Sequence, residues 1–219
     1  MIAQLHRHAL AGVTVVPMRR RHLRAVLAIE QQVYPRPWSP NLFAAELAQG
    51  PSRRYLVALA PRRGSALGPR VGREVVGYTG LILQPGDHGR PGEGDAHVTT
   101  VAVHPHHHRR KVASRLLHAL LAEARRVGAR AATLEVRVAN RGAQRLYTAF
   151  GFAGVGVRPG YYAETGEDAL IMWISELQSD EMGACLAAQA ARLGDPGGAS
   201  GAPDLHVPWV KGRRGLEVP

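Results

Sequence analysis

Cysteine, lysine and long apolar runs are scarce in this chain of 219 residues. The one cysteine, Cys185, excludes an internal disulfide and is typical of proteins in a reducing compartment. Lysine occurs only at Lys111 and Lys211, so arginine supplies nearly all the positive charge behind the net +11. No run approaches the roughly 20 apolar residues of a spanning helix. We therefore expect no membrane segment, no signal peptide and a cytoplasmic location.

Aromatic residues are also few, at 5% of the chain. The arginine-rich clusters at 19–21, 62–63 and 109–111 lack the interleaved aromatics on which nucleic-acid bases stack. The basic charge is compatible with a general attraction to ribosomes or acidic partners. The sequence predicts no specific nucleic-acid recognition.

Histidine, by contrast, is concentrated in one short segment. The residues are His104, His106, His107 and His108. Histidine-rich tracts can bind metal ions. Adjacent histidines lack the i, i+4 spacing of a helical zinc site, however, and no thiol or carboxylate follows at ligand spacing. We expect solvated side chains here and no metal, and we expect His97 to be structural.

Apolar periodicity divides the chain into strands and helices. Short β-branched or apolar runs predict strands at 13–18, 55–60, 75–83, 97–103, 133–138, 152–157 and 168–174. Helical spacing of apolar residues predicts helices at 22–33, 41–48, 110–127 and 142–149, and permits another at 182–193. The alternation in the second half predicts an α/β (α+β) fold whose sheet has at least one parallel pair.

Composition also suggests the domain limits. We expect an N-terminal extension at 1–11, one folded domain at 12–177 and a mostly disordered tail at 178–219. The tail is assigned in this way because its Gly, Pro, Ser and Asp residues at 194–203 offer nothing to bury. The Gly-, Pro- and Arg-rich segment at 61–73 is expected to be a surface loop.

The segment L-E-V-R-V-A-N-R-G-A-Q-R-L-Y-T-A-F-G-F, residues 134–152, is the most informative for function. It places Glu135 on a strand and Tyr147 on the helix that follows. A carboxylate and a phenol at one end of a sheet can take a proton from a nucleophile and return one to a leaving group. Taken singly, each residue favours a structural role, as a glutamate at a strand edge and a tyrosine that packs a helix.

The full spacing N-x-x-A-x-x-L-Y-x-x-x-G-F resembles the GNAT superfamily of acyl-CoA-dependent N-acetyltransferases, particularly the RimI type. The similarity runs over about 13–174. It implies a mixed, mostly antiparallel sheet of about seven strands, with a central parallel pair splayed for acyl-CoA and about four flanking helices. It also implies that Glu135 is the general base and Tyr147 the general acid.

In this family a Val-Ala-Val strand and the following loop hold acetyl-CoA. The resemblance implies cofactor contacts from Val101, Ala102, Val103, Arg109, Arg110, Lys111, Val112, Ala113, Ser114 and Asn140. The family pattern Q/R-x-x-G-x-G/A is altered here, because His108 replaces Gln or Arg and Lys111 replaces the first Gly. A left-handed backbone at Lys111 would cost about 1–2 kcal/mol, although its ammonium can pair with phosphates. Asn140 is equally an ordinary helix N-cap.

The same resemblance implies the acceptor. Pro37-Trp38-Ser39 and Gly160-Tyr161-Tyr162 look like the segments that flank the RimI-type peptide groove, where the substrate is the N-terminal alanine of a ribosomal protein. Trp38 and Tyr161 are therefore candidate substrate-binding residues, or alternatively packing residues.

Two other functions remain open. The scaffold could acetylate a small amine such as a polyamine or an aminoglycoside, or it could be a non-catalytic module whose cofactor loop is impaired by Lys111. The sequence gives no indication of the oligomeric state.

Overall fold

The computed structural model describes residues 12–62, 72–84 and 94–194. One seven-stranded sheet runs through them. Its strands are β1 (Thr14–Pro17), β2 (Arg53–Pro61), β3 (Arg73–Leu83), β4 (Ala96–Val103), β5 (Ala132–Arg137), β6 (Ala153–Tyr162) and β7 (Glu167–Ile174). The helices are α1 (Leu23–Val33), α2 (Pro40–Ala48), α3 (Val112–Arg126), α4 (Arg141–Ala149) and α5 (Asp180–Leu193), with 3-10 turns η1 (Arg20–His22), η2 (Gly50–Ser52) and η3 (Pro105–His107). The expected extension at 1–11 and most of the expected 61–73 loop lie outside the described residues.

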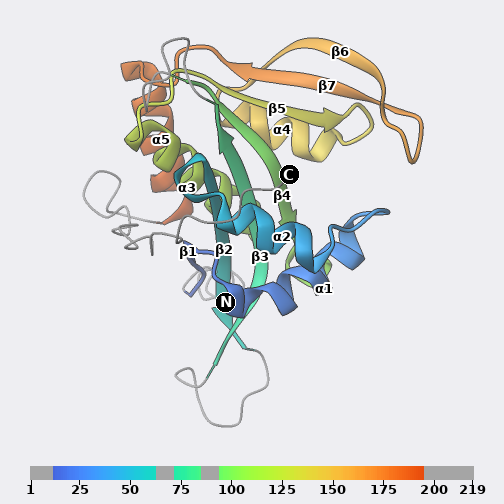
Figure 1. Ribbon diagram of the computed structural model, residues 1–219. Coiled ribbons are helices and arrows are strands. Elements are labelled where there is room, and N and C mark those ends of the chain that lie inside the picture. Colours follow the sequence, from blue (N-terminus) through green and yellow to red (C-terminus); the bar gives the residue numbers. More distant parts are fainter. Residues whose placement is uncertain (1–11, 63–71, 85–93, 195–219) are drawn as a thin grey trace, which may run out of the picture.

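The strand order is β1-β2-β3-β4-β5-β7-β6, and β4–β5 is the parallel pair. This pair is joined only at Ala96↔Ala132 and His97↔Thr133. Beyond these residues β4 and β5 turn away from each other (Figure 1). The predicted mixed sheet with a splayed central parallel pair is therefore confirmed.

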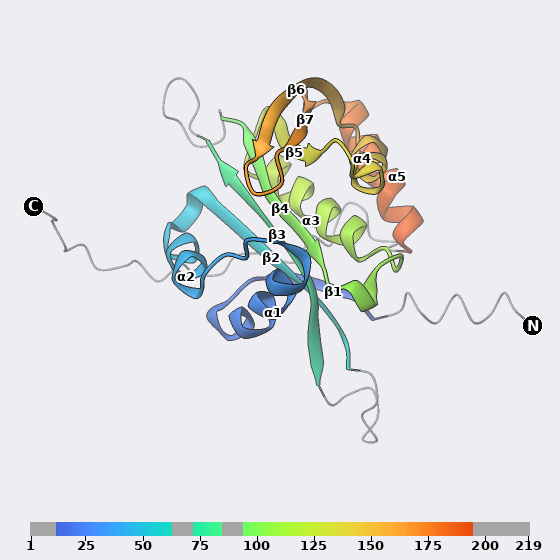
Figure 2. The same cartoon turned by 90° about the vertical axis from the view of Figure 1, so that its right-hand side faces the viewer.

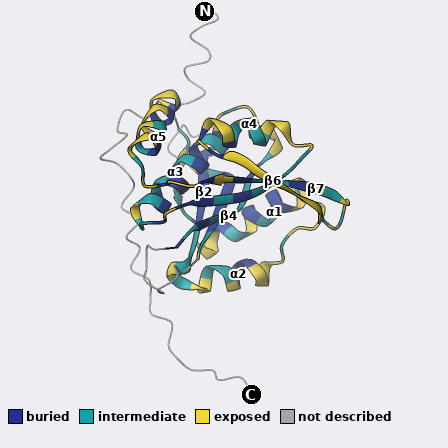
Figure 3. Cartoon of the chain, turned by 90° about the horizontal axis from the view of Figure 1, so that it is seen from above, coloured by how far each residue is buried: buried dark blue, intermediate teal, exposed yellow. Residues whose placement is uncertain are grey.

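Helices cover the sheet on both faces. Figure 2 shows α1 and α2 on one face and α3, α4 and α5 on the other. The first face is closed by a cluster around Phe43 and Tyr78, and the second by a larger cluster that includes Leu117 and Phe150. The edge strand β6 is almost entirely exposed, in contrast to the buried centre of the sheet (Figure 3). None of the described helices is long and apolar enough to cross a membrane.

The Ser39-Pro40 pair explains where helix α2 begins. Ser39 is the N-cap of α2, where its side chain accepts a hydrogen bond from Leu42 N, and Pro40 occupies the first helical position as expected.

A glycine is required at one position inside the sheet. Gly80 lies opposite Tyr55, and an added Cβ would come within 2.3 Å of the tyrosine ring. Only glycine fits there without displacing the ring, because 2.3 Å is far inside van der Waals contact.

Helix α5 extends the packed part of the chain beyond the boundary expected at residue 177. Its buried residues Met182, Leu186, Ala190 and Leu193 recur at helical spacing, and Met182 and Leu186 join the larger core cluster. Ser179 caps the helix through a hydrogen bond from Met182 N. The remainder of the expected tail, 195–219, lies outside the described residues.

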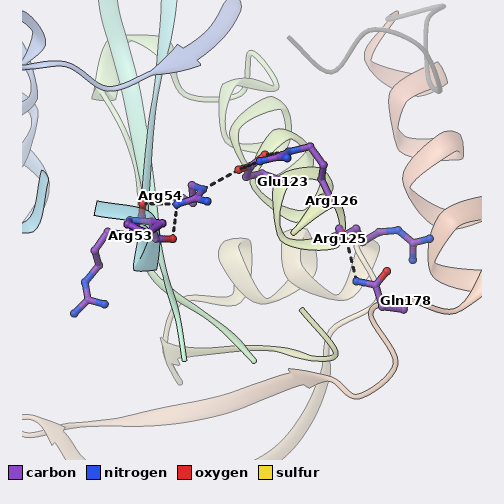
Figure 4. Close-up of polar contacts among 7 residues, drawn as sticks. Arg53, Arg54, Glu123, Arg125, Arg126 and Gln178 are labelled. Atoms are coloured by element: carbon purple, nitrogen blue, oxygen red, sulfur yellow. Dashed lines mark hydrogen bonds and ion pairs between the residues drawn. The ribbon is translucent and has the colours of Figure 1, made fainter. Parts of the chain in front are cut away.

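A buried ion pair ties the sheet to α3. Arg54 on β2 donates from Nε to Glu123 Oε1 at 2.8 Å, and Arg126 donates from Nε to Glu123 Oε2 at 2.7 Å (Figure 4). The Glu123 side chain is 2% exposed. Both carboxylate oxygens are thus satisfied by charged donors, which is the condition for burying a charge without a large penalty.

Candidate active site

The carboxylate of Glu135 lies on the α1 side of the sheet, near the point where β4 and β5 separate. Its side chain is 13% exposed and contacts one cationic or ionisable group on each oxygen. Oε2 is 3.4 Å from His97 Nε2, and Oε1 is 3.4 Å from Arg158 Nη1. Glu135 is therefore a partly accessible carboxylate held between two strands, as proton transfer with a bound substrate requires.

Tyr147 extends from α4 into the larger core cluster, where its ring lies edge-on to Phe152. Its hydroxyl makes no hydrogen bond to any described residue. Burial, and secondarily the phenols of Tyr34 and Tyr162, raise the pKa of Tyr147 above its usual value. The phenol is thus kept protonated, as a proton donor must be.

Tyr34 and Tyr162 are the polar neighbours of Tyr147, and each has a further partner. Tyr34, just after α1, shares a 2.9 Å hydrogen bond with Thr100 on β4. Burial, outweighing the opposing charge of Arg137, raises the pKa of Tyr162 to about 12, and Glu135 and Tyr34 contribute in the same direction. Arg137 lies over the Tyr162 ring, 3.9 Å from its centroid. Tyr162 is therefore an electrostatic neighbour of both Tyr147 and Glu135.

Strand β4 presents an unpaired edge to this gap. His104 N–H donates to Val76 O on β3, so the alternation of an antiparallel ladder directs the backbone groups of Val101 and Val103 to the opposite edge. His108 donates from Nε2 to the Val103 carbonyl at 2.9 Å. The N–H groups of Val101 and Val103 are thus directed at the gap, where an extended ligand can pair with them as an added strand does.

The loop between η3 and α3 has an unusual backbone. Arg109 and Lys111 adopt left-handed conformations, with φ of 60° and 56°. The left-handed position anticipated at residue 111 is therefore real, and its cost of about 1–2 kcal/mol applies to a lysine. Because Arg109 and Lys111 do not have helical backbone angles, α3 begins at Val112 and not at residue 110 as predicted.

The same loop is suited to an anion. No side chain caps the N-terminus of α3, and its first turn contains no acidic residue. The unpaired N–H groups and the positive dipole end therefore face a loop that carries Arg109, Arg110 and Lys111. Free backbone N–H groups at a helix N-terminus, together with cationic side chains, are the hydrogen-bond donors that bind a pyrophosphate. The Lys111 ammonium itself donates to Arg192 O at the end of α5, over 2.7 Å.

The other predicted site residues have visible structural roles. Asn140 caps α4, where its Oδ1 accepts from Ala143 N at 3.0 Å. The Trp38 ring packs against Phe43 with 5.2 Å between centroids. Tyr161 is 41% exposed and lies 5.1 Å from the guanidinium of Arg158. Tyr161 thus faces the same side of the sheet as Glu135, whereas the partly buried Trp38 ring lies against the cluster that contains Phe43.

The histidine tract is held by local contacts. His104 caps η3 by accepting from His106 N, and His107 lies 3.5 Å from Glu74. Within the described ranges no group of three or more His, Cys, Asp or Glu residues is placed to hold a metal ion.

Sequence reasoning did not identify Tyr34 or Arg158 as neighbours of the site. Tyr34 follows a helix as an isolated aromatic residue, and Arg158 lies on an edge strand that was predicted to end at residue 157. Both reach the site through strand register and loop geometry. The one available signal was the periodicity of β6, which puts Arg158 opposite Ala169 on the face that carries Glu135.

Comparisons with known proteins agree with this geometry. A model of the acetyltransferase (GNAT) family matches residues 23–152. The chain is 33% identical over 162 residues to the N-alpha-acetyltransferase RimI of Mycobacterium tuberculosis, covering 73% of this chain and 90% of that protein. It is 29% identical over 161 residues to the ribosomal protein bS18-alanine N-acetyltransferase of Escherichia coli (strain K12), covering 73% and 95%. The crystal structure of the ribosomal-protein-S18-alanine N-acetyltransferase from Escherichia coli superposes with a TM-score of 0.59 at 26% identity, covering 77% and 97%.

Proposed function

The chain belongs to the GNAT family of acetyltransferases, which use acetyl-CoA, and on that premise we propose that its acceptor is the N-terminal α-amine of a protein. Glu135 acts as the general base and Tyr147 as the general acid. The observation that supports the assignment is the partly accessible carboxylate of Glu135 beside the separating strands β4 and β5, with Tyr162 as an electrostatic neighbour of both Glu135 and Tyr147. Relatives named as N-terminal acetyltransferases, which match this chain over at least 90% of their length, support the choice of acceptor.

The proposed reaction moves two protons away from the acceptor amine. Glu135 takes the first from the ammonium form, and the free amine then attacks the thioester carbonyl. The carbon–sulfur bond breaks, and Tyr147 donates its proton to the departing thiolate. The new amide nitrogen loses the second proton, which restores Tyr147. The products are an acetylated amine and a thiol.

Residues of this chain supply the binding contacts in the proposal. The edge of β4 formed by Val101, Ala102 and Val103 pairs with the extended arm of the cofactor. The turn from Arg109 to Ser114, including Val112 and Ala113, holds its phosphates at the N-terminus of α3. One N–H of β4 stabilises the oxyanion that forms at the thioester carbonyl. Asn140 contacts the cofactor next to the cap that it provides for α4.

An α-amine suits Glu135 better than a lysine side chain does. The pKa of an α-amine is ~2–3 units below that of a lysine ε-amine, so it is more easily deprotonated at neutral pH. The finer proposal is that the acceptor is a ribosomal protein beginning with alanine. It rests on the names of the relatives, and the exposed Tyr161 ring is proposed to contact the bound peptide.

The test is an acetylation assay with purified full-length protein, acetyl-CoA and three acceptors. These are an alanine-starting peptide, the same peptide with a blocked N-terminus and an internal lysine, and a polyamine. We expect one acetyl group on the α-amine of the first peptide and none on the blocked one. Glu135→Gln should lower kcat by about 10²-fold or more. Glu181→Gln, an exposed carboxylate-to-amide change on α5, serves as the matched control.

Two results would contradict the proposal. Preferential acetylation of the polyamine would move the enzyme to the small-amine acetyltransferases. Full activity of Glu135→Gln would show that another group removes the proton.

A further inference from the structure

His97 lies at the point where the parallel strands β4 and β5 separate. His97 and Thr133 are the last residues at which β4 and β5 are paired, before the two strands separate. The residue on the same face one step further along β5 is Glu135. The His97 side chain is 25% exposed, so the ring is neither a core residue nor a freely solvated one.

Both ring nitrogens of His97 face polar groups of β5. Nδ1 lies 2.9 Å from Thr133 Oγ1, and Nε2 lies 3.4 Å from Glu135 Oε2. An imidazole whose Nδ1–H donates to the threonine hydroxyl presents the lone pair of Nε2 to the carboxylate. The threonine hydroxyl can donate or accept and so accommodates either neutral tautomer; in the Nδ1–H tautomer, Nε2 can receive a proton from Glu135.

The surroundings of Glu135 give this contact a chemical role. Arg158 Nη1 lies 3.4 Å from Oε1, whereas His97 Nε2 lies 3.4 Å from Oε2, where a neutral imidazole can accept a proton. After Glu135 has taken a proton from an amine, the carboxyl must lose that proton before the next turnover. A neighbouring base that is itself accessible to solvent can take this proton from Glu135 and pass it to water.

We propose that His97 is a positioning residue that receives the proton from Glu135 and releases it to solvent, with Thr133 fixing the ring. In this step the O–H bond of the protonated Glu135 breaks and an N–H bond forms at His97 Nε2. The resulting imidazolium and carboxylate remain paired until the proton passes to water. The inference rests on the proposed role of Glu135 as the base.

Three variants separate a proton relay from a merely structural role. His97→Ala removes the base and leaves room for a small molecule. His97→Gln fills a similar volume and can donate a hydrogen bond to Glu135, but it cannot accept the proton. Thr133→Val removes the hydroxyl that fixes the ring. His106→Ala, a histidine exposed on η3, is the matched control for losing an imidazole.

The measurements are kcat and KM with an alanine-starting peptide, the Kd for acetyl-CoA, and rescue by free imidazole. We expect both His97 variants to lower kcat by about tenfold, less than the loss of a direct general base. KM and Kd should stay within about twofold, because His97 contacts Thr133 and Glu135 and is not among the residues proposed to hold either ligand. Imidazole should restore part of the rate of His97→Ala and none of the rate of His97→Gln. Thr133→Val should lower kcat by a smaller factor.

The inference would be overturned by a wild-type kcat in His97→Ala, or by a loss that appears in KM alone and does not respond to imidazole. Should His97→Ala fold poorly, a kcat deficit in a stably folded His97→Gln decides the question. Glu135→Gln, measured in parallel, separates the two proposals. If it is inactive while the His97 variants are fully active, only the relay fails. If Glu135→Gln is fully active, the assignment of the base fails first.

Discussion

Lys111 donates a hydrogen bond from its ammonium to the carbonyl oxygen of Arg192, across 81 positions in the sequence. The contact joins the loop before α3 to the end of α5. Arg115, one turn into α3, likewise donates from its guanidinium to the Leu193 carbonyl. Two cationic side chains therefore satisfy the last carbonyls of α5, where the helix dipole is negative. A lysine in the position where the family has glycine is thus integrated into the fold.

This arrangement predicts a modest contribution of Lys111 to cofactor binding. The Lys111→Ala variant keeps the left-handed strain but loses the ammonium, and should weaken acetyl-CoA binding by up to about fivefold, the value of an exposed ion pair. Lys111→Gly also relieves the strain and should bind at least as well as the alanine variant. Calorimetric titration of the three proteins provides the values.

Binding of acetyl-CoA by Lys111→Gly alone would contradict this prediction. If the wild type failed to bind acetyl-CoA while Lys111→Gly bound it, the lysine would have disabled the loop. The prediction above would then be wrong, and catalysis would have to be sought in the variant.

Replacing Tyr147 by Phe should reduce catalysis without reducing stability. Its hydroxyl has no hydrogen-bond partner among the described residues, so the phenylalanine ring fills the same space at no structural cost. We expect kcat to fall by about 10²-fold, with an unchanged Kd for acetyl-CoA.

Tyr55→Phe is the control for Tyr147→Phe, because the Tyr55 hydroxyl donates to Glu46 at 2.8 Å within the fold. It should lose about 1.5–3 kcal/mol of unfolding free energy, the value of a hydrogen bond to a charged group, and keep its kcat. A Tyr147→Phe enzyme with the wild-type rate would remove Tyr147 from the acid role.

Much of the architecture was predictable because it is encoded locally. Short β-branched or apolar runs predicted each strand of the sheet, and the Ser39-Pro40 pair predicted where α2 begins. The motif spacing put Glu135 on β5 and Tyr147 on α4. Helix α5 carried a readable signal in Met182, Leu186 and Leu193, but the neighbouring Gly- and Pro-rich composition outweighed it.

The polar connections of the site were not predictable from sequence. The contact of His97 with Glu135 depends on the register of β4 against β5 at the one place where these strands pair. That register is set by packing across the whole sheet and leaves no local pattern in the sequence. The same holds for Lys111, whose partner is the end of a distant helix.

His22 should make stability sensitive to mild acid. It is a buried residue whose Nδ1 accepts from Arg19 N at 3.1 Å. Burial, then the charges of Arg21 and Arg19, lower the pKa of His22 below 6.5. The unfolded chain therefore binds the proton more readily, and the stability contributed by neutral His22 is lost as pH falls below 6.5. Chemical denaturation of wild type and His22→Asn should show their difference shrinking in that range. The exposed-site variant His106→Asn is the control for losing an imidazole, and a constant difference for His22→Asn would refute the assignment.

Glu123 should give the largest single loss of stability. Burial alone would raise the pKa of its carboxyl, but the hydrogen bonds from Arg126 and Arg54 outweigh it and lower the pKa below 4.5. The stabilisation from charged Glu123 is therefore present above pH 4.5 and lost as pH falls through the lowered value. Glu123→Gln leaves the partly buried Arg54 without its counter-charge, which should cost about 3–5 kcal/mol at neutral pH.

Urea unfolding at neutral pH and at successively lower pH tests this in one series. The gap between wild type and Glu123→Gln should be widest at neutral pH and should close in acid, because the wild-type carboxyl is then also uncharged. Glu181→Gln, at an exposed carboxylate on the first turn of α5, should differ from the wild type by at most about 1 kcal/mol, the value of an interaction with the helix dipole. A gap that stayed the same at every pH would mean that Glu123 stabilises the protein through packing alone, and that its charge contributes nothing to the link between β2 and α3.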